Sequence, residues 1–549
     1  MGKRVSPARV AGIVVIVALA LLALPSFASA HAERPSYFPN FDAVAKKYFA
    51  AFGNVPGYRN RGPALVVCKR DSLARIRALP SRTRRQRAIK ARNLIYLRLC
   101  RFRHIQSAVK AASSNMRILV LPGIYREEPS RGEPNPDPAC ASNMTADAKG
   151  GGRVPAYEYH VNCPNSQNLI SVTGDGPDAD RRCDTRCNLQ ISGTAYRDSV
   201  LITSERSKLN VIRADRADGI YLSNFTIEYS DFNNIYVLET NGFHINQVES
   251  RYSREYGVLS FASDNGLYEN IEAYNSGDSG IYPGSGPEGH CQRYGIEIRN
   301  VDSHDNTLGY SGTAGNGVYV HDSKFHDNAT GIVTDSFAAG HPGMPQDCAK
   351  WENNQVYSNN NDLYNAERDA YCKQPAAARD PKIVCPTFQT AVGTGLMIAG
   401  GNGNITRGNQ IWDNWRAGAR LFFVPTQLRG DDNTGQSVND QANQFDTSNN
   451  NSYVNNKMGF RPDGTRDPNG MDFWWDEEGK GNCWSGNVGP GGRPVTSDPA
   501  NLPGCPTGSA FSTGNTLKVV SQASCATWDP MDNTDPPGCD WFTRPPEPR

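Results

Sequence analysis

From residue 219 onward the chain repeats itself, and this repeat excludes most fold classes. Five copies begin with a glycine followed by an apolar residue, and they start 23, 24, 29 and 22 residues apart, at Gly219, Gly242, Gly266, Gly295 and Gly317. Each copy continues with a second short apolar segment: NIYVL, YGVLS, SGIYP, LGYSG and TGIVT, from residues 234, 256, 279, 308 and 330. Units of this length, with short strands and Gly/Asn turns, are typical of the coils of a parallel β-helix.

The repeat places one apolar residue of each copy at an equivalent position: Ile220, Phe243, Leu267, Ile296 and Val318. We expect these side chains to stack in the core, one per coil, at the spacing of about 4.8 Å between neighbouring strands. Apolar residues also alternate within the segments, as a strand with one buried face requires.

Composition agrees with this interpretation. The chain holds 48 Asn and 52 Gly, and both types favour tight turns. Asn224, Asn270 and Asn300 fall at the predicted corners, where stacked Asn side chains bond the backbone and one another. A narrow solenoid core needs few apolar residues, so a hydrophobic content of 38% suffices for 549 residues.

The coils extend in both directions. Downstream segments with the same pattern cover residues 351–364, 395–414 and 448–459. Upstream, residues 102–127 predict a short helix on Ile105, Ala108, Val109 and Ala112, followed by a first strand over 118–121. The helix would cover the open apolar end of the solenoid.

Four regions follow from these patterns. They are a signal peptide (1–30), a basic and partly helical arm (31–101), the β-helix (102–470) and a Trp/Cys-rich C-terminal cap (471–549). In the cap, Trp474, Trp475 and Trp484 either stack on sugar rings or, as we favour, seal the apolar end of the solenoid.

With the entry IQSAV…ILVLPGIYRE, the coils over about residues 100–460 resemble the right-handed parallel β-helix superfamily with the pectin-lyase-like fold. The resemblance implies an all-β, single-stranded right-handed parallel β-helix, the hand that crossover connections also favour. The superfamily includes polysaccharide lyases, glycoside hydrolases, C5-epimerases and non-catalytic adhesins. Its known signatures are not found in the coils: there is no DPHD motif, and the one RxPxxR match, at residues 544–549, and the one NTD, at residues 533–535, both lie in the tail.

The N-terminus predicts export. Lys3, Arg4 and Arg9 precede an apolar run from Val10 to Leu24, and Ala28-Ser29-Ala30 has the small-x-small pattern of a cleavage site. The run is shorter than the roughly 20 residues that span a bilayer, so we expect a secreted protein without a membrane span in its mature part.

All 14 cysteines follow residue 30, which predicts up to seven disulfides. Local spacing and loop positions suggest five pairs: Cys68/Cys100, Cys291/Cys348, Cys372/Cys385, Cys483/Cys505 and Cys525/Cys539. The spacing Cys183-x₃-Cys187 is a weak metal candidate without neighbouring His, so no metal is assigned.

Charge is segregated along the chain. The net charge is +1, of which residues 69–103, with 13 Lys/Arg and Asp71 alone, contribute +12 and the signal peptide +3; the remainder carries 1 − 12 − 3 = −14. The basic segment either binds an anionic polymer or, as we favour, turns its cations to solvent or to the acidic body.

Insertions in a solenoid gather on one face and build the binding surface. Two leave the same strand two coils apart: YPGSGPEGHCQRY after Ile281 and VTDSFAAGHPGMPQDCAKW after Ile332, and Cys291–Cys348 would join them. The expected catalytic residues are Asp278, Tyr282, His290, Asp335 and His341, and the expected substrate-binding residues are Glu288, Tyr310, Ser311 and Asp347. A lyase or epimerase needs a base and an acid, and a hydrolase needs two carboxylates.

Two further observations limit the chemistry. The sequence His-Asp-Asn recurs at 304–306 and 326–328, one coil apart, which favours a structural ladder over a catalytic or cation site. The acidic body suits a polyanionic substrate only if Ca²⁺ bridges the two, so Ca²⁺ is the one cofactor considered.

We therefore expect a monomeric, carbohydrate-active protein that binds a polysaccharide or cell-wall polymer along the β-helix face, and not a nucleic acid. If it is an enzyme, it is a polysaccharide lyase, C5-epimerase or glycoside hydrolase that cleaves or epimerises this polymer. The alternative is a non-catalytic cell-surface or cell-wall interaction scaffold.

Overall fold

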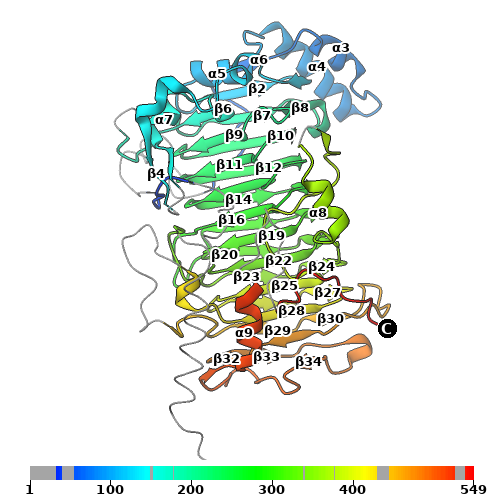
Figure 1. Cartoon of the computed structure of the whole chain (residues 1–549). Helices are drawn as coiled ribbons and strands as arrows, with labels where there is room; N and C mark the ends of the chain where they lie inside the picture. Colours follow the sequence, from blue (N-terminus) through cyan, green and yellow to red (C-terminus); the bar gives the residue numbers. More distant parts are fainter. Residues whose placement is uncertain are drawn as a thin grey trace, which may run out of the picture.

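A computed structural model describes residues 33–39, 55–148, 152–176, 179–337, 340–375, 378–429, 444–525 and 538–549. The chain winds into a right-handed parallel β-helix whose strands stack along one axis, with helices at the N-terminal end (Figure 1). The predicted fold is confirmed. The predicted signal peptide lies outside the described residues. Among the helices described, none is long and apolar enough to cross a membrane.

Three rows of strands form the walls. Two rows belong to one 20-stranded sheet, because the long strands β10 (Ile220–Glu228) and β12 (Asn241–Arg251) pair with members of both. The first row adds β1 (Ala64–Val67), β2 (Arg117–Val120), β7 (Gln190–Gly193), β14 (Asp264–Glu269), β17 (Ile296–Arg299), β20 (Val318–His321), β23 (Lys350–Glu352), β26 (Ile405–Arg407), β29 (Ser452–Val454) and β33 (Cys483–Ser485). The second adds β3 (Gly123–Tyr125), β8 (Val200–Thr203), β15 (Glu272–Tyr274), β18 (Asp302–His304), β21 (Lys324–His326), β24 (Gln355–Tyr357), β27 (Gln410–Trp412) and β30 (Lys457–Met458).

The third row is a separate 11-stranded sheet. It contains β6 (Asn168–Thr173), β9 (Asn210–Asp215), β11 (Asn233–Leu238), β13 (Val258–Phe261), β16 (Ser279–Gly284), β19 (Leu308–Thr313), β22 (Thr330–Asp335), β25 (Thr394–Ala399), β28 (Ala417–Phe422), β31 (Phe473–Trp475) and β34 (Ser497–Asp498). Short antiparallel pairs are formed by β4 (Met144–Ala146) with β5 (Arg153–Pro155) and by β32 (Glu478–Gly479) with β35 (Ser512–Thr513).

The core stack differs from the sequence alignment in one coil. Ile220 pairs with Phe243, but Phe243 pairs with Gly266 and not with Leu267, which lies opposite His244. The expected place of Leu267 in the stack is therefore wrong. A Cβ on Gly266 would lie 2.1 Å from the Phe243 ring, so the aromatic ring fills the space that a side chain would otherwise take.

Buried asparagines form ladders at the corners, as the composition predicted. In the longest, each Asn amide donates to the Oδ1 of the Asn one coil further on, at 3.0–3.1 Å, through Asn306, Asn328, Asn359, Asn414 and Asn469. The corner residues Asn224, Asn270 and Asn300 have positive φ, which Asn tolerates better than most residues.

The N-terminal end contains one strand more than expected. Helix α5 (Ile105–Ala111) buries its apolar residues against the core, as predicted. The first strand is β1 rather than β2, however, and the two pair in parallel. The basic arm therefore contributes a strand to the solenoid. Other helices are α3 (Ser72–Ala78), α4 (Arg84–Arg98), α6 (Glu128–Arg131), α7 (Tyr157–Asn162), α8 (Ala366–Cys372) and α9 (Thr516–Cys525).

The parallel rows also extend past residue 470, the expected end of the coils. Strands β31, β33 and β34 continue the pairing. Trp475 and Trp484 are buried in the main core, and the Trp484 ring stacks on Tyr453 at 5.3 Å. Trp474 lies outside that core, with Arg420 and Lys518 over its ring.

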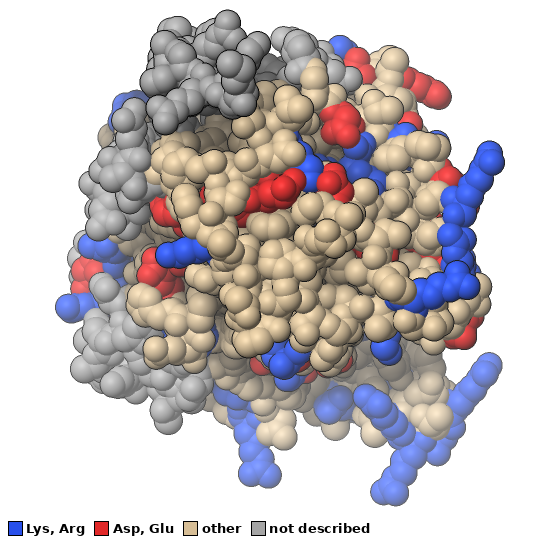
Figure 2. All heavy atoms as spheres, turned by 90° about the horizontal axis from the view of Figure 1, so that it is seen from below, with Lys and Arg blue, Asp and Glu red and all other residues tan. Residues whose placement is uncertain are grey.

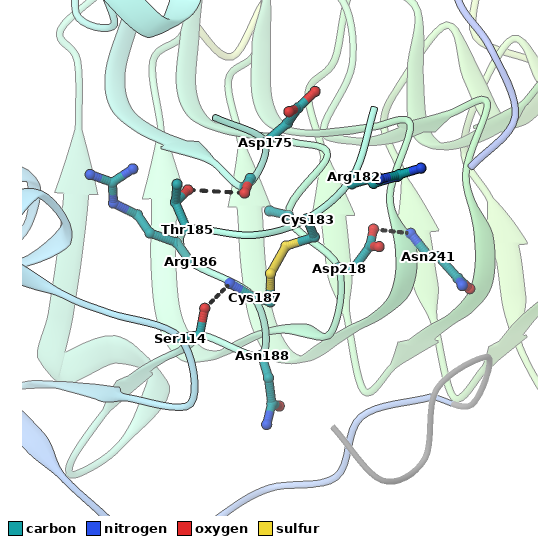
Figure 3. The surroundings of a disulfide bond; sticks show 12 residues. Ser114, Asp175, Arg182, Cys183, Thr185, Arg186, Cys187, Asn188, Asp218 and Asn241 are labelled. Atoms are coloured by element: carbon teal, nitrogen blue, oxygen red, sulfur yellow. Dashed lines mark hydrogen bonds between the residues drawn. A yellow bond between two sulfur atoms is a disulfide. The ribbon is translucent and has the colours of Figure 1, made fainter. Parts of the chain in front are cut away.

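Seven disulfides link all 14 cysteines. Five are the pairs suggested by the sequence, and Cys140–Cys163 and Cys183–Cys187 complete the set. Cys183 and Cys187 thus hold each other instead of a metal, and the Cys187 N–H donates to Ser114 Oγ at 3.0 Å (Figure 3).

The two disulfides near the C-terminus connect a buried cysteine to a more exposed one. Cys483 and Cys525 are buried, at the start of β33 and the end of α9, whereas Cys505 and Cys539 are only partly buried and lie outside the strands and helices. The pairs Cys483–Cys505 and Cys525–Cys539 are formed as the spacing suggested. Because β33 pairs with β29 of the preceding coil, the Cys483–Cys505 bond ties the loop that contains Cys505 to the last coils of the solenoid.

Candidate functional site

Four predicted residues converge over the outward face of the 11-stranded sheet. Tyr282 follows the core residue Ile281 in β16, so its ring points outward, and its hydroxyl lies 3.1 Å from His341 Nε2. Two strands further on, Asp335 Oδ2 accepts a hydrogen bond from Thr313 at 2.9 Å. Asp278, the residue before β16, interacts with the buried Tyr256. These four residues therefore lie together on one face of the sheet.

The electrostatics keep the Tyr282 hydroxyl protonated. Burial raises its pKa well above the ordinary value, and the nearby carboxylates of Asp335 and Asp278 raise it further, whereas a hydrogen bond with Thr313 opposes the shift. Tyr256 stacks on the Tyr282 ring at 4.6 Å and fixes its position. A protonated phenol and an imidazole joined by a hydrogen bond are the kinds of group that transfer protons in catalysis.

These groups are shielded from solvent. Asp278, Tyr282, Asp335 and His341 are at most 2% exposed, and Ser311 is 3% exposed. Tyr310 points into the solenoid core, against Phe325 and Trp351, and has no outward surface for a substrate. The expectation that Tyr310 binds substrate therefore conflicts with its register, because residues of alternating strand positions face opposite sides.

Part of this cover is an extended segment, residues 33–39, which we call the strap. Arg34 is 4% exposed and contacts Asp215 at 3.0 Å and Glu239 at 2.5 Å. Phe38 packs against the apolar cluster that includes Tyr282. Around Arg34 lies a network of three arginines and four carboxylates: Arg34, Arg213, Arg216, Glu33, Asp175, Asp215 and Glu239.

The remaining predicted residues form a second, accessible group at the rim of the same sheet. The disulfide Cys291–Cys348 joins the two inserted loops. Glu288 and His290 have side chains 46% and 77% exposed and lie 3.6 Å apart. Asp347 is half-buried, and burial, with a further contribution from the charge of Glu288, raises its pKa to about 7. We call Glu288, His290 and Asp347 the clasp group.

The His-Asp-Asn repeat forms a ladder, as the sequence favoured. The rings of Tyr274, His304, His326, Tyr357 and Trp412 stack in succession, with centroids 4.3–5.1 Å apart. Because each ring face covers the next, the interior rings offer only their edges to a ligand. No group of His, Cys, Asp and Glu suited to a metal ion occurs in the described part of the chain.

Sequence reasoning missed a hollow lined by three arginines. Arg206 and Arg254, from the turns before β9 and β13, meet Arg379, which lies in the loop closed by Cys372–Cys385. The hollow is small, with a volume of about 40 Å³. The disulfide-closed loop was the only sequence feature that could have pointed to this hollow. The spacing of the three arginines along the chain does not indicate that they lie together.

No family model matches the chain, and no curated protein matches it. Solved structures similar to it include the mannuronan C-5 epimerase AlgE4 A-module of Azotobacter vinelandii (12% identity, 74% of this chain and 94% of that chain, TM-score 0.39). Others are the Dettilon tailspike protein (11%, 66% and 63%, 0.35) and pectate lyase Pel9A (13%, 79% and 82%, 0.30). The chain is a parallel β-helix protein. Its strand register establishes this, and similarities at these scores add nothing on function.

Proposed function

We propose that this protein binds an extended polysaccharide at the clasp group and transfers a proton to it from Asp347. The observation that carries the proposal is the half-buried carboxyl of Asp347, with a pKa of about 7, beside the exposed Glu288. A carboxyl with a pKa near neutrality serves as a general acid, and a second carboxylate nearby serves as a base.

The surroundings of Asp347 support a positioned acid. Its backbone N–H donates to Asn316 Oδ1 at 2.6 Å, and its neighbour Cys348 is tied to Cys291. The loops on which the acid and Glu288 lie are thereby held together.

The proposal is tested by incubating the protein with neutral and uronic polysaccharides, with and without Ca²⁺, while following reducing ends, unsaturated products and epimer ratio. Replacing Asp347 by Asn should lower turnover by roughly 10²–10⁴-fold, the usual contribution of a general acid. Asp463→Asn, in an exposed turn, is the matched control and should leave turnover unchanged. Equal turnover in both variants would remove Asp347 from the reaction.

A second candidate function, a non-catalytic scaffold that binds the same polymer, is favoured by one observation. Asp278, Tyr282, Asp335 and His341, which have the types needed for proton abstraction, are inaccessible to a substrate. Measurable binding to a polysaccharide, together with no product on any substrate, would select this function over the first.

A further inference from the structure

The helices of the basic arm carry a positive charge that the rest of the protein hardly neutralises. Residues 69–103 contain 13 Lys and Arg and one acid. Of these 13 cations, only two form ion pairs with residues that the structure describes: Lys69 with Glu128 at 3.6 Å, and Arg75 with Asp71 at 2.6 Å. The other cations do not pair with the acidic body, so their charge is available to a partner.

The orientation of α4 is fixed by its buried side. Ile89 and Asn93 are buried, and Asn93 exchanges hydrogen bonds with Thr194 of the first coils, its amide donating to the Thr194 carbonyl at 3.0 Å. The disulfide Cys68–Cys100 closes the segment that contains α3 and α4. The opposite side of α4 therefore points steadily away from the solenoid, at its N-terminal tip (Figure 1).

That outward side combines apolar and basic residues. Ile95 and Leu99 are 59% and 57% exposed, and Leu94 is 38% exposed. At 100° per residue, Ile95 and the C-cap residue Leu99 lie on one stripe with two exposed alanines, with Arg84 at its N-terminal end and further arginines along both edges. The alanines are Ala88 and Ala91, and the arginines are Arg85 and Arg92 on one edge and Arg87 and Arg98 on the other.

We propose that this face of α4 docks the protein onto an anionic lipid bilayer. The cations fit any polyanion, but the exposed stripe through Ile95 and Leu99 favours a bilayer, whose acyl boundary accepts apolar side chains beneath charged headgroups. A soluble acidic polysaccharide or a nucleic acid offers no such apolar layer. The proposal is independent of the clasp group and of the proposed function.

Among the described residues, the opposite end of the molecule has a different arrangement of charge. Seen from the last coils, acidic side chains lie near the centre and basic side chains mostly at the edge (Figure 2). This end provides matched control positions: Lys480 and Arg493 are exposed, and Leu517 of α9 is 83% exposed.

The test uses the full mature chain and sedimentation with vesicles of phosphatidylcholine alone or with one quarter phosphatidylglycerol. We expect binding only to the anionic vesicles, weakened by salt. Replacing Arg85 and Arg92 together by Gln should lower the partition coefficient about 30-fold, at about fivefold per cation. The Lys480→Gln/Arg493→Gln variant should bind like the unaltered protein.

A second pair of variants tests the apolar stripe. Ile95→Asp with Leu99→Asp should lower binding at least tenfold, whereas Leu517→Asp should not; circular dichroism checks that each variant is folded. The proposal would be overturned if binding did not depend on phosphatidylglycerol. It would also be overturned if neither the Arg85/Arg92 variant nor the Ile95/Leu99 variant bound more weakly than the unaltered protein. Binding to a sulfated polysaccharide or to nucleic acid without binding to vesicles would overturn it as well.

Discussion

Replacing Arg34 by Ala tests whether the strap is held by its buried charge. The change leaves Asp215 with Arg213 and Glu239 with Arg216, because each carboxylate keeps one arginine partner. The network then has two arginines against four carboxylates, and removing one partner of a buried ion pair costs about 3–5 kcal/mol. We expect the strap to detach rather than remain docked over the unbalanced charge.

Limited proteolysis measures this detachment. A protease that cleaves after aromatic residues would cut after Tyr37 only when the strap is open, so the cleavage rate follows the open population. A loss of about 3 kcal/mol raises that population by roughly 100-fold. The open population of Arg34→Lys should lie between that of the unaltered protein and that of Arg34→Ala, because an ammonium keeps the charge but lacks the planar fork that contacts two carboxylates.

The matched control is Arg182→Ala, which removes an arginine half exposed beside Asp180. Such surface pairs contribute about 0–1 kcal/mol, so strap cleavage should hardly change. Burial opposes ionisation of Asp215, but Arg34 and Arg213 outweigh it and lower the pKa to about 2. The stability that ionised Asp215 contributes is complete above about pH 4 and is lost as the pH falls toward 2. Equal cleavage of Arg34→Ala and Arg182→Ala would refute the reasoning.

Three further predictions concern other parts of the fold. Burial raises the pKa of Glu478 to about 10, so stability is lost as the pH rises above the pKa of this carboxyl in the unfolded chain. Glu478→Gln should therefore increase the free energy of unfolding by on the order of 3 kcal/mol at pH 7. An unchanged denaturant midpoint would contradict this. Hydrogen bonds with Asp305 and Glu272 outweigh burial and raise the pKa of His304 to about 9. NMR titration of His304 should therefore show a cation up to this pH, with its stabilising contribution fully present below about pH 6.5 and lost toward pH 9; a midpoint below 7 would refute it. Replacing Cys291 and Cys348 by Ser should lower the free energy of unfolding by about 2–5 kcal/mol, and an unchanged melting curve would show that this disulfide does not constrain the two loops.

Periodicity made the fold predictable, because each coil repeats the same pattern of buried and turn residues. The same regularity misled at Gly266: the sequence aligned Leu267 with the core, and only the size of the Phe243 ring in the neighbouring coil decides the register. The expected placement was thus off by one residue, at the point where the Phe243 ring fills the space that a side chain at residue 266 would take.

The candidate site was predictable in location and not in accessibility. The two insertions leave the same strand position, which brings Tyr282 near His341 and Cys291 near Cys348. Their cover could not be foreseen, because the strap is 181 residues from Asp215 in sequence and has no periodic pattern that would pair Arg34 with it. Contacts of this kind depend on the folded surface as a whole.

The asparagine ladder has a consequence for how this protein tolerates changes of length. Successive rungs are 22, 31, 55 and 55 residues apart along the chain, and yet the amide-to-oxygen distances stay within 3.0–3.1 Å. Up to 33 extra residues thus pass between two rungs without disturbing the bond. Engineered domains inserted between rungs should leave the scaffold intact, whereas deleting a single residue within a strand would turn the following residues of that strand to the opposite face.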